Sequence, residues 1–203
     1  MKQTVFSVKS NTKLTDCVYK MELAGDTSDI SAPGQFVNIK LDGLFLRRPI
    51  SVCDCKDDIL TIVYKTVGKG TEKMSGMLPG EKLDVLTGLG NGYDTSLSGE
   101  KPLLLGGGVG VPPLYLLAKK LREEGKEPEV VLGFNTKNEI FYEAEFKALG
   151  LDVTVTTADG SYGKKGFVTD AFPENYTYFY TCGPEPMLKA VYKKSKTSGQ
   201  MSF

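Results

Sequence analysis

The pattern of apolar and polar positions changes character near the middle of the chain. In the amino-terminal half, short β-branched or aromatic runs predict strands at Thr4–Lys9, Cys17–Leu23, Gln35–Leu41, Ile59–Val67 and Lys82–Leu86. Turn formers such as Ala32-Pro33-Gly34 separate them. Short strands at this spacing favour a small antiparallel barrel or sandwich. One helical segment is expected at Thr71–Met77, because Thr71 is suited to N-capping and Pro79 follows.

From Leu103 onward, continuous apolar runs alternate with helical patterns. The expected strands are Leu103–Leu105, Val130–Phe134, Leu151–Thr157 and Tyr176–Thr181, and the expected helices are 112–124, 139–149 and 185–195. Apolar strands joined by helices are typical of a parallel sheet covered on both faces. We therefore expect a β-barrel domain over residues 1–97 and an α/β domain over residues 98–203.

Composition narrows the functional classes. The 203 residues carry 25 basic and 25 acidic side chains and no His. Zero net charge argues against a broadly basic nucleic-acid binder and against electrostatic attraction to an anionic membrane. The lack of His excludes Ser-His-Asp and Cys-His nucleophile pairs and His-ligated zinc. We find no secretory segment, and the cysteines show no framework spacing, so a cytoplasmic location is expected.

The strongest local signal is Arg47-Arg48-Pro49-Ile50-Ser51. Pro49 lacks an N–H donor, which places this segment at a strand edge or start. An Arg pair held there offers fork-shaped donors for a phosphate, and the Ser51 hydroxyl would lie near a planar ring. The plain alternative is a solvated Arg pair before an edge strand.

A second candidate follows in the same half. Val63-Tyr64-Lys65 precedes Gly68-Lys69-Gly70-Thr71, which opens the short expected helix. Glycines before a helix leave backbone N–H groups free to face an anion. The alternative is a hairpin turn followed by a capped helix.

The glycine run from Gly106 to Gly110, followed by Pro112 and Pro113, lies between an expected strand and helix. Its position is that of a phosphate-binding loop. The spacing does not match G-x-G-x-x-G, the second strand ends at Asn135 without an acidic residue, and no Walker lysine follows. The alternative is a tight glycine turn without a ligand.

Two further segments follow strands of the same expected sheet. Cys182-Gly183-Pro184 ends the last strand, and Asp159-Gly160-Ser161-Tyr162-Gly163 follows the third. Ligands of open α/β sheets bind at the carboxyl edge, so both segments are candidates to face a cofactor. Cys182 as a buried packing residue and residues 159–163 as a surface loop remain the alternatives.

Taken in order, these motifs resemble the ferredoxin–NADP reductase superfamily. Within it, they are most similar to the family of electron-transfer subunits of type B dihydroorotate dehydrogenases. The resemblance covers nearly the whole chain. It rests on Ala32–Phe36, Arg47–Ser51, Gly106–Pro112, Asp159–Gly163 and Tyr180–Pro184.

The resemblance implies FAD in the barrel domain and NAD on the α/β domain, with the flavin ring between the domains. It assigns FAD to Arg48, Pro49, Ile50, Ser51, Val63, Tyr64, Lys65, Gly70 and Thr71. It assigns the nicotinamide nucleotide to Gly106, Gly107, Gly108, Gly110, Asp159, Gly160, Cys182, Gly183 and Pro184. Ser51 and Cys182 are the expected catalytic positions, beside the flavin and the nicotinamide respectively. The uncharged Asn135 favours NAD over NADP.

The implied partner is a dihydroorotate-oxidising flavoprotein, in a heterotetramer of two plus two subunits. The family also carries a [2Fe–2S] cluster on four cysteines after the last helix. Here Cys17, Cys53, Cys55 and Cys182 do not form such a set. The expectation is that the chain either is truncated after Phe203 or lacks the cluster.

Two other functional classes stay open from the sequence. One is a free-standing NAD(P)H-dependent flavin or ferredoxin reductase, or a subunit of another redox complex. The other is a nucleotide-binding module without enzymatic activity, in which Arg48 and Gly108 are only structural. Hydride transfer belongs to the cofactors and needs no general base, which agrees with the absence of His.

Overall fold

The structure, a computed structural model, describes residues 1–197. The chain divides into two compact units, Met1–Tyr93 and a second that begins at Asp94. Within the described residues, no helix combines the length and apolar character needed to cross a membrane.

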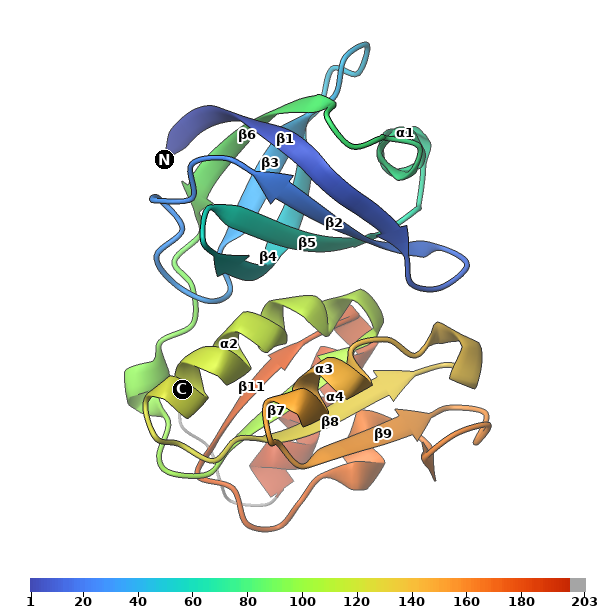
Figure 1. The fold of residues 1–203 in the computed structure, drawn as a ribbon. Helices are drawn as coiled ribbons and strands as arrows, with labels where there is room; N and C mark the ends of the chain where they lie inside the picture. The colour runs from blue at the N-terminus through green and yellow to red at the C-terminus, as the bar shows by residue number, and fades with distance from the viewer. Residues whose placement is uncertain (198–203) are drawn as a thin grey trace. The chain divides into compact units, whose positions relative to one another are not determined.

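The first unit is a closed barrel with the strand order β1-β2-β5-β4-β3-β6 (Figure 1). All pairings are antiparallel. The strands are β1 (Lys2–Lys13), β2 (Val18–Ala24), β3 (Phe36–Lys40), β4 (Arg48–Lys56), β5 (Ile59–Lys65) and β6 (Lys82–Leu89). Alternating side chains fill the barrel, among them Phe6, Met21, Ile39 and Ile62, which are fully buried. The predicted antiparallel barrel is confirmed, and Pro49 is the second residue of β4.

The short helix of the barrel begins earlier than predicted. Helix α1 spans Lys69–Ser75, and Gly68, not Thr71, occupies the N-cap position in an extended conformation. Thr71 lies in the first turn instead, where its hydroxyl accepts from Val67 N (2.9 Å) and donates to Gly68 O (3.1 Å). The sequence misplaced the cap because Thr71 closes the turn backward, toward the residues that precede the helix.

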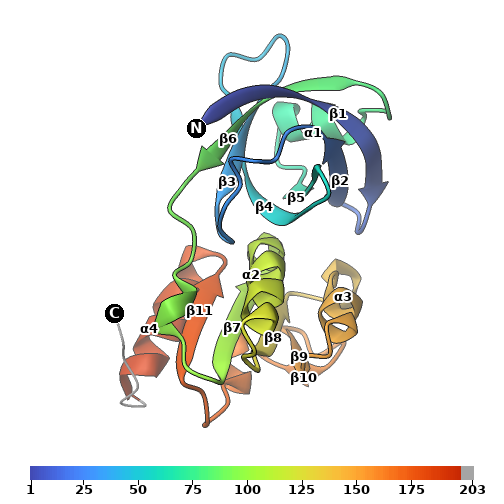
Figure 2. The ribbon, with the colours of Figure 1, turned by 60° about the vertical axis from the view of Figure 1, so that its left-hand side comes forward.

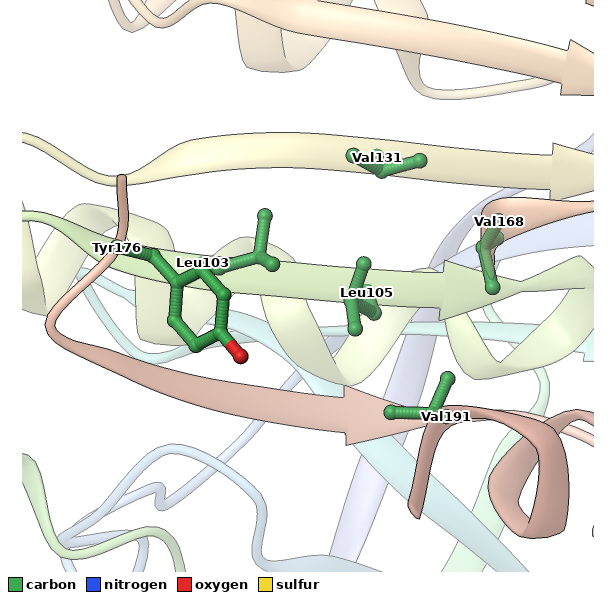
Figure 3. Close-up of a cluster of buried hydrophobic side chains, with 6 residues drawn as sticks. All are labelled: Leu103, Leu105, Val131, Val168, Tyr176 and Val191. Carbon is green, nitrogen blue, oxygen red and sulfur yellow. The ribbon is translucent and has the colours of Figure 1, made fainter. Parts of the chain in front are cut away.

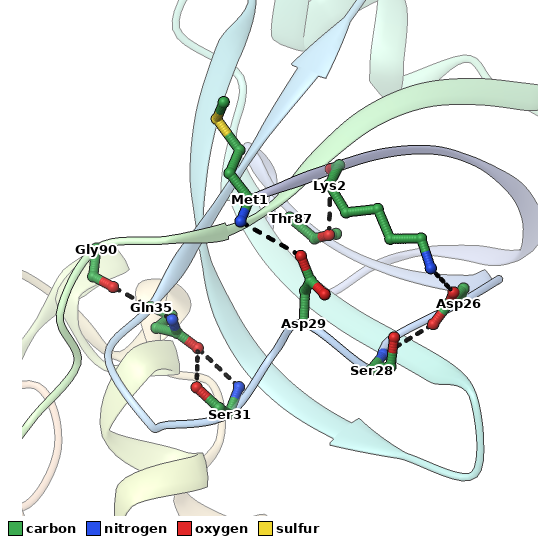
Figure 4. Close-up of polar contacts among 9 residues, drawn as sticks. All are labelled: Met1, Lys2, Asp26, Ser28, Asp29, Ser31, Gln35, Thr87 and Gly90. Carbon is green, nitrogen blue, oxygen red and sulfur yellow. Dashed lines mark hydrogen bonds and ion pairs between the residues drawn. The ribbon is translucent and has the colours of Figure 1, made fainter.

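The turn before β3 is held by one glutamine. Gln35 Oε1 accepts from the backbone N–H of Ser31 (2.8 Å) and Ala32 (3.1 Å), and its Nε2 donates to Gly90 O (3.2 Å) (Figure 4). Tyr93 N also donates to Pro33 O (2.7 Å). These bonds tie the Ala32–Gly34 turn to the segment that leaves β6.

The second unit is a parallel sheet with helices on both faces. Its strand order is β10-β9-β8-β7-β11. The strands are β7 (Pro102–Gly107), β8 (Glu129–Phe134), β9 (Val153–Thr157), β10 (Lys164–Lys165) and β11 (Tyr178–Cys182). The helices are α2 (Pro112–Glu123), α3 (Glu143–Ala148) and α4 (Glu185–Thr197), with 3₁₀ turns η1 (Thr95–Leu97), η2 (Gly108–Gly110), η3 (Lys137–Glu139) and η4 (Val168–Ala171). Figure 2 shows α2 and α3 side by side. The predicted parallel sheet is confirmed.

The two faces of this sheet have separate apolar cores. One core joins the sheet to η4 and α4 and contains Leu103, Leu105, Val131, Val168, Tyr176 and Val191 (Figure 3). On the other face, Tyr115 of α2 makes edge-to-face contacts with Tyr142 (5.2 Å) and Phe146 (5.4 Å). The helix predicted from Glu139 begins only at Glu143, because the buried Tyr142 adopts a left-handed conformation (φ 67°) that interrupts it.

Candidate functional site

The barrel opens along one stretch between two neighbouring strands. The ladder between β4 and β5 starts at the Val52–Ile62 pair. Before that point, Arg48–Ser51 pairs with β3, whereas Val63–Lys65 pairs with β2. The two segments that the sequence singled out therefore border the same interrupted ladder. Backbone groups along such an edge are available to a planar ligand with hydrogen-bonding groups at its rim.

The structure separates the roles of the two arginines. Arg47 forms an ion pair with Asp84 (2.9 Å) and donates to Asn38 O (3.1 Å) and Asp84 O (3.2 Å). Arg48 donates hydrogen bonds to the backbone carbonyls of Leu46 and Arg47, and no acidic residue in the described range pairs with it. The solvated-pair alternative fails for Arg47, which is structural. Arg48 keeps an unneutralised charge that suits an anionic ligand.

Arg48 and the start of α1 lie in direct contact. A Cβ added at Gly70 would stand 2.1 Å from Arg48 Nε and 2.7 Å from Cζ, so any side chain at this position would displace the Arg48 guanidinium. The N-cap residue Gly68 carries no side-chain cap. A guanidinium beside the first-turn N–H groups of a helix is an arrangement that fits a phosphate. These residues fit the diphosphate of a dinucleotide cofactor.

The remaining barrel candidates differ in what their side chains offer. Ile50 and Ser51 are half-buried on β4, and Lys65 is exposed at the end of β5. Val63 is buried. The Tyr64 side chain is only 2% exposed, so its phenol belongs to the barrel interior and only its backbone borders the open edge. Burial raises the pKa of Tyr64 to about 12, and its hydroxyl donates to Asn11 Oδ1 (3.0 Å).

In the second unit, two candidate loops meet at the carboxyl edge of the sheet. Cys182 lies opposite Gly106 in the β11–β7 pairing. A Cβ added at Gly110 would stand 2.2 Å from Cys182 O, so the glycine loop approaches the end of β11 backbone to backbone. Gly108 has positive φ (51°) with nothing within 4 Å of its Cβ position, so the space beside its α-carbon is open. Side-chain-free backbone next to open space fits the phosphates of a nucleotide.

Met187 fixes the spacing of these loops. Its sulfur occupies the space beside two glycines, since a Cβ would lie 2.4 Å away at Gly107 and 2.8 Å away at Gly183. Met187 lies three residues after Pro184 and outside the motifs of the sequence analysis. Pro184, which directly follows Gly183, is exposed at the same edge of the sheet.

The loop after β9 carries an acidic side chain, Asp159, held by a neighbouring serine. Asp159 accepts from Ser161 N (2.9 Å) and Oγ (2.7 Å), and these bonds hold the pKa of its carboxyl below its usual value. Ser161 Oγ in turn accepts from Lys137 N (2.8 Å), which joins the loops after β8 and β9. Gly160 beside them has positive φ (79°).

Glu139 was missed in the sequence. Its carboxylate folds back and accepts from Asn135 Nδ2 (2.8 Å), so β8 does end beside an acidic group. The signal was the acidic residue four places after Asn135, but only the 3₁₀ turn η3 brings it back.

The cysteines do not fit an iron–sulfur cluster. Cys53 is buried on β4 with Cys55 two positions on, Cys17 precedes β2, and Cys182 belongs to the other unit. Residues 1–197 hold no group of three or more side chains suited to a metal ion. The segment 198–203, where the sequence analysis places the start of the family's cluster region, lies outside the described residues.

Comparison with known proteins agrees with this architecture. Residues 104–193 match the family model described as an oxidoreductase NAD-binding domain. The FAD/NAD-binding domain of nitric oxide dioxygenase from Vibrio cholerae is 21% identical, with a TM-score of 0.84 and coverage of 98% of this chain and 94% of that one. This likeness concerns the fold. The barrel and the parallel-sheet unit together have the fold of the ferredoxin–NADP reductase type.

Relatives with higher sequence identity show which family the chain belongs to. A chain of the NADH-dependent reduced ferredoxin–NADP oxidoreductase, solved for flavin-based electron bifurcation, is 34% identical with a TM-score of 0.85, covering 95% of this chain and 72% of that one. The dihydroorotate dehydrogenase B (NAD(+)) electron transfer subunit of Bacillus pumilus is 46% identical over 202 residues, 94% of this chain and 78% of that protein. Its Fusobacterium nucleatum counterpart is 44% identical over 212 residues, 97% of this chain and 82% of that protein. The chain belongs to the family of dihydroorotate dehydrogenase B (NAD(+)) electron transfer subunits.

Proposed function

We propose that this chain carries electrons from a dihydroorotate-oxidising partner through FAD to NAD, in pyrimidine biosynthesis. The observation that carries this function is the presence of two nucleotide geometries on one chain. Arg48 stands unneutralised against Gly70 in the barrel, and Gly110 meets Cys182 at the edge of the parallel sheet. Membership of the electron transfer subunit family selects the reaction.

In the barrel, Arg48 and the first-turn N–H groups of Gly70 and Thr71 bind the FAD diphosphate. Pro49, Ile50 and Ser51 present one side of the open edge to the flavin ring, and Val63, Tyr64 and Lys65 border it with their backbone. Arg47 neutralises Asp84 and keeps β4 in place. Bound FAD and NAD supply the hydride-transfer chemistry, so this chain contributes binding and orientation.

In the second unit, Gly106–Gly110 and Cys182–Pro184 bind the nicotinamide nucleotide, with Cys182 at the nicotinamide end. Asp159 and Gly160 lie on the ribose side. The Asp159 carboxylate stays ionised because the Ser161 bonds lower its pKa. A 2′-phosphate would meet that negative charge, so we assign NAD in preference to NADP.

The name shared by the relatives implies a catalytic partner subunit, and we propose that it is the dihydroorotate-oxidising flavoprotein in a two-plus-two assembly. We place the complex in the cytoplasm, where the four cysteines stay reduced. The cysteines of residues 1–197 do not form a set of cluster ligands. The proposed electron path therefore includes no [2Fe–2S] cluster on these residues.

The function is tested in two stages with the purified protein. First, the protein should contain flavin that is released on denaturation and is bleached by NADH without oxygen. Second, the partner subunit co-purified from the native host should be identified. Colourless protein that takes up no added FAD would overturn the flavoprotein assignment, and a partner that does not oxidise dihydroorotate would overturn the pathway.

A second candidate is a subunit of another redox complex. The observation that favours it is the 34% identity with a chain of the NADH-dependent reduced ferredoxin–NADP oxidoreductase. Such a protein would also show bleaching by NADH, so bleaching does not separate the two. Reduction of the FAD by dihydroorotate in the presence of the co-purified partner supports the first function, and reduction by reduced ferredoxin alone supports the second.

A further inference from the structure

Helix α1 is held at its far end by a residue outside every motif. We propose that Asn11, on β1, is a positioning residue for the flavin diphosphate site, because it holds the carboxyl end of α1 and so sets where Gly70 stands beside Arg48. This inference rests on the proposed function, since it takes the diphosphate to bind at Arg48 and Gly70.

The helix needs such an anchor. It has seven residues, which is too short for a stable helix by itself. Its last backbone carbonyls have no partner within the helix. Met74, fully buried, fixes the apolar side of α1 in the barrel. Backbone N–H groups satisfy part of this end, since Gly76 N donates to Lys73 O (3.3 Å) and Met77 N to Met74 O (3.0 Å), but among the described residues Ser75 O and Met77 O receive no such backbone bond.

Asn11 supplies a side-chain donor at this end of α1. Its Nδ2 lies 2.9 Å from Met74 O, 3.3 Å from Ser75 O and 3.2 Å from Met77 O. Sixty-three residues separate Asn11 from Met74 in sequence, so this contact joins the first strand of the barrel to the helix. Carbonyl oxygens only accept hydrogen bonds, and the amide nitrogen must therefore face the helix.

Tyr64 fixes the opposite side of the same amide. Its hydroxyl donates to Asn11 Oδ1 at 3.0 Å, and its ring stacks on Tyr19 with centroids 5.9 Å apart. With a pKa of about 12, the hydroxyl stays protonated and remains a donor at any working pH. Tyr64 thus connects the open edge of β5, through Asn11, to the end of α1.

A change at Asn11 is transmitted along α1 to the phosphate site. The helix spans less than two turns and moves as one piece. At its other end, Gly70 is so close to Arg48 that a single added carbon would stand 2.1 Å from Nε. A small shift of α1 therefore changes the distance between the guanidinium and the first-turn N–H groups, which together face the phosphates.

The test compares FAD binding by apoprotein variants. Asn11→Asp keeps the shape of the side chain but turns a carboxylate oxygen toward the three carbonyls. It should raise the Kd for FAD at least about tenfold, measured by quenching of flavin fluorescence, because it replaces hydrogen bonds by repulsion. Tyr64→Phe keeps the ring and removes the hydroxyl, and should raise the Kd about threefold. The N–H of Met77, bonded to Met74 O at 3.0 Å, should exchange with deuterium faster in both variants without FAD.

Ser10→Ala is the matched control, since Ser10 is adjacent on β1 and its hydroxyl bonds to Glu22 (2.9 Å), not to α1. It should leave the Kd for FAD and the exchange of α1 unchanged. All variants are compared where circular dichroism shows them folded. Equal FAD affinity in folded Asn11→Asp, Tyr64→Phe and parent protein would overturn the positioning role while leaving the proposed function intact. A parent protein that binds no FAD would instead overturn the proposed function.

Discussion

The guanidinium of Arg48 lies directly against the α-carbon of Gly70, so that a Cβ on Gly70 would stand 2.1 Å from Arg48 Nε. Gly70→Ala should therefore push Arg48 out of place and weaken FAD binding by about tenfold or more. Gly76→Ala is the control, because a Cβ there meets only Lys73 O at 3.8 Å in the same region of the chain. Isothermal titration of apoprotein with FAD measures the FAD affinity of both variants. Equal losses in the two variants would contradict a specific contact between Arg48 and Gly70.

Substitution of the two adjacent arginines should have different effects, one on FAD binding and the other on stability. Arg48→Ala removes a charge-assisted contact to phosphate, which costs about 2 kcal/mol of FAD binding, or about thirtyfold in Kd, with little change in stability. Arg47→Ala breaks the bonds to Asp84 and Asn38 and should lower the free energy of unfolding by about 1 to 2 kcal/mol. Urea unfolding and FAD titration separate the two effects. Unchanged FAD affinity in Arg48→Ala would return Arg48 to a solvated surface role.

Gly110→Ala tests the edge of the parallel sheet. The added Cβ would stand 2.2 Å from Cys182 O, and because both sides are backbone, rotation of a side chain cannot relieve the clash. We expect the KM for NADH to rise about tenfold while FAD stays bound. Glu123→Ala, an exposed position at the carboxyl end of α2 in the same unit, is the control and should change neither the KM for NADH nor the FAD content. If Gly110→Ala lost FAD to the same extent as NADH binding, the two sites would not be separable.

Cys182→Ser should retain FAD and slow the oxidation of NADH about fivefold, because the half-buried Cys182 ends β11 at the edge where we propose that the nicotinamide binds. Stopped-flow reduction of the bound flavin by NADH measures this step. Cys55→Ser, on β4 of the other unit, serves as the comparison and should leave the NADH step unchanged. Unchanged hydride-transfer kinetics in Cys182→Ser would make Cys182 a packing residue.

The 203 residues should hold no iron–sulfur cluster. Their four cysteines lie before β2, on β4 and at the end of β11, and residues 1–197 hold no set of candidate metal ligands. Iron and acid-labile sulfide should each be found well below stoichiometry, while NADH still reduces the FAD. A stoichiometric [2Fe–2S] spectrum from these residues alone would refute the cysteine argument.

The sequence by itself determined the fold class and the segments proposed to bear the sites. Strand–turn periodicity, the Arg48–Ser51 motif and the Gly106–Gly110 loop are local patterns, because turn chemistry and apolar spacing act over a few residues. The same local character placed Pro49 near the start of its strand and Cys182 at the end of another.

The tertiary structure decided what required distant partners. Which of the two arginines is neutralised depends on Asp84, 37 residues away from Arg47. The anchoring of α1 by Asn11 spans 63 residues, and the return of Glu139 to Asn135 needs the turn η3. Helix α1 begins at Lys69 and not at the predicted Thr71, because the Thr71 hydroxyl accepts a hydrogen bond from Val67 N, before the helix. Such choices follow from side-chain contacts between strands that only the closed barrel and the parallel sheet bring together, and no local pattern encodes them.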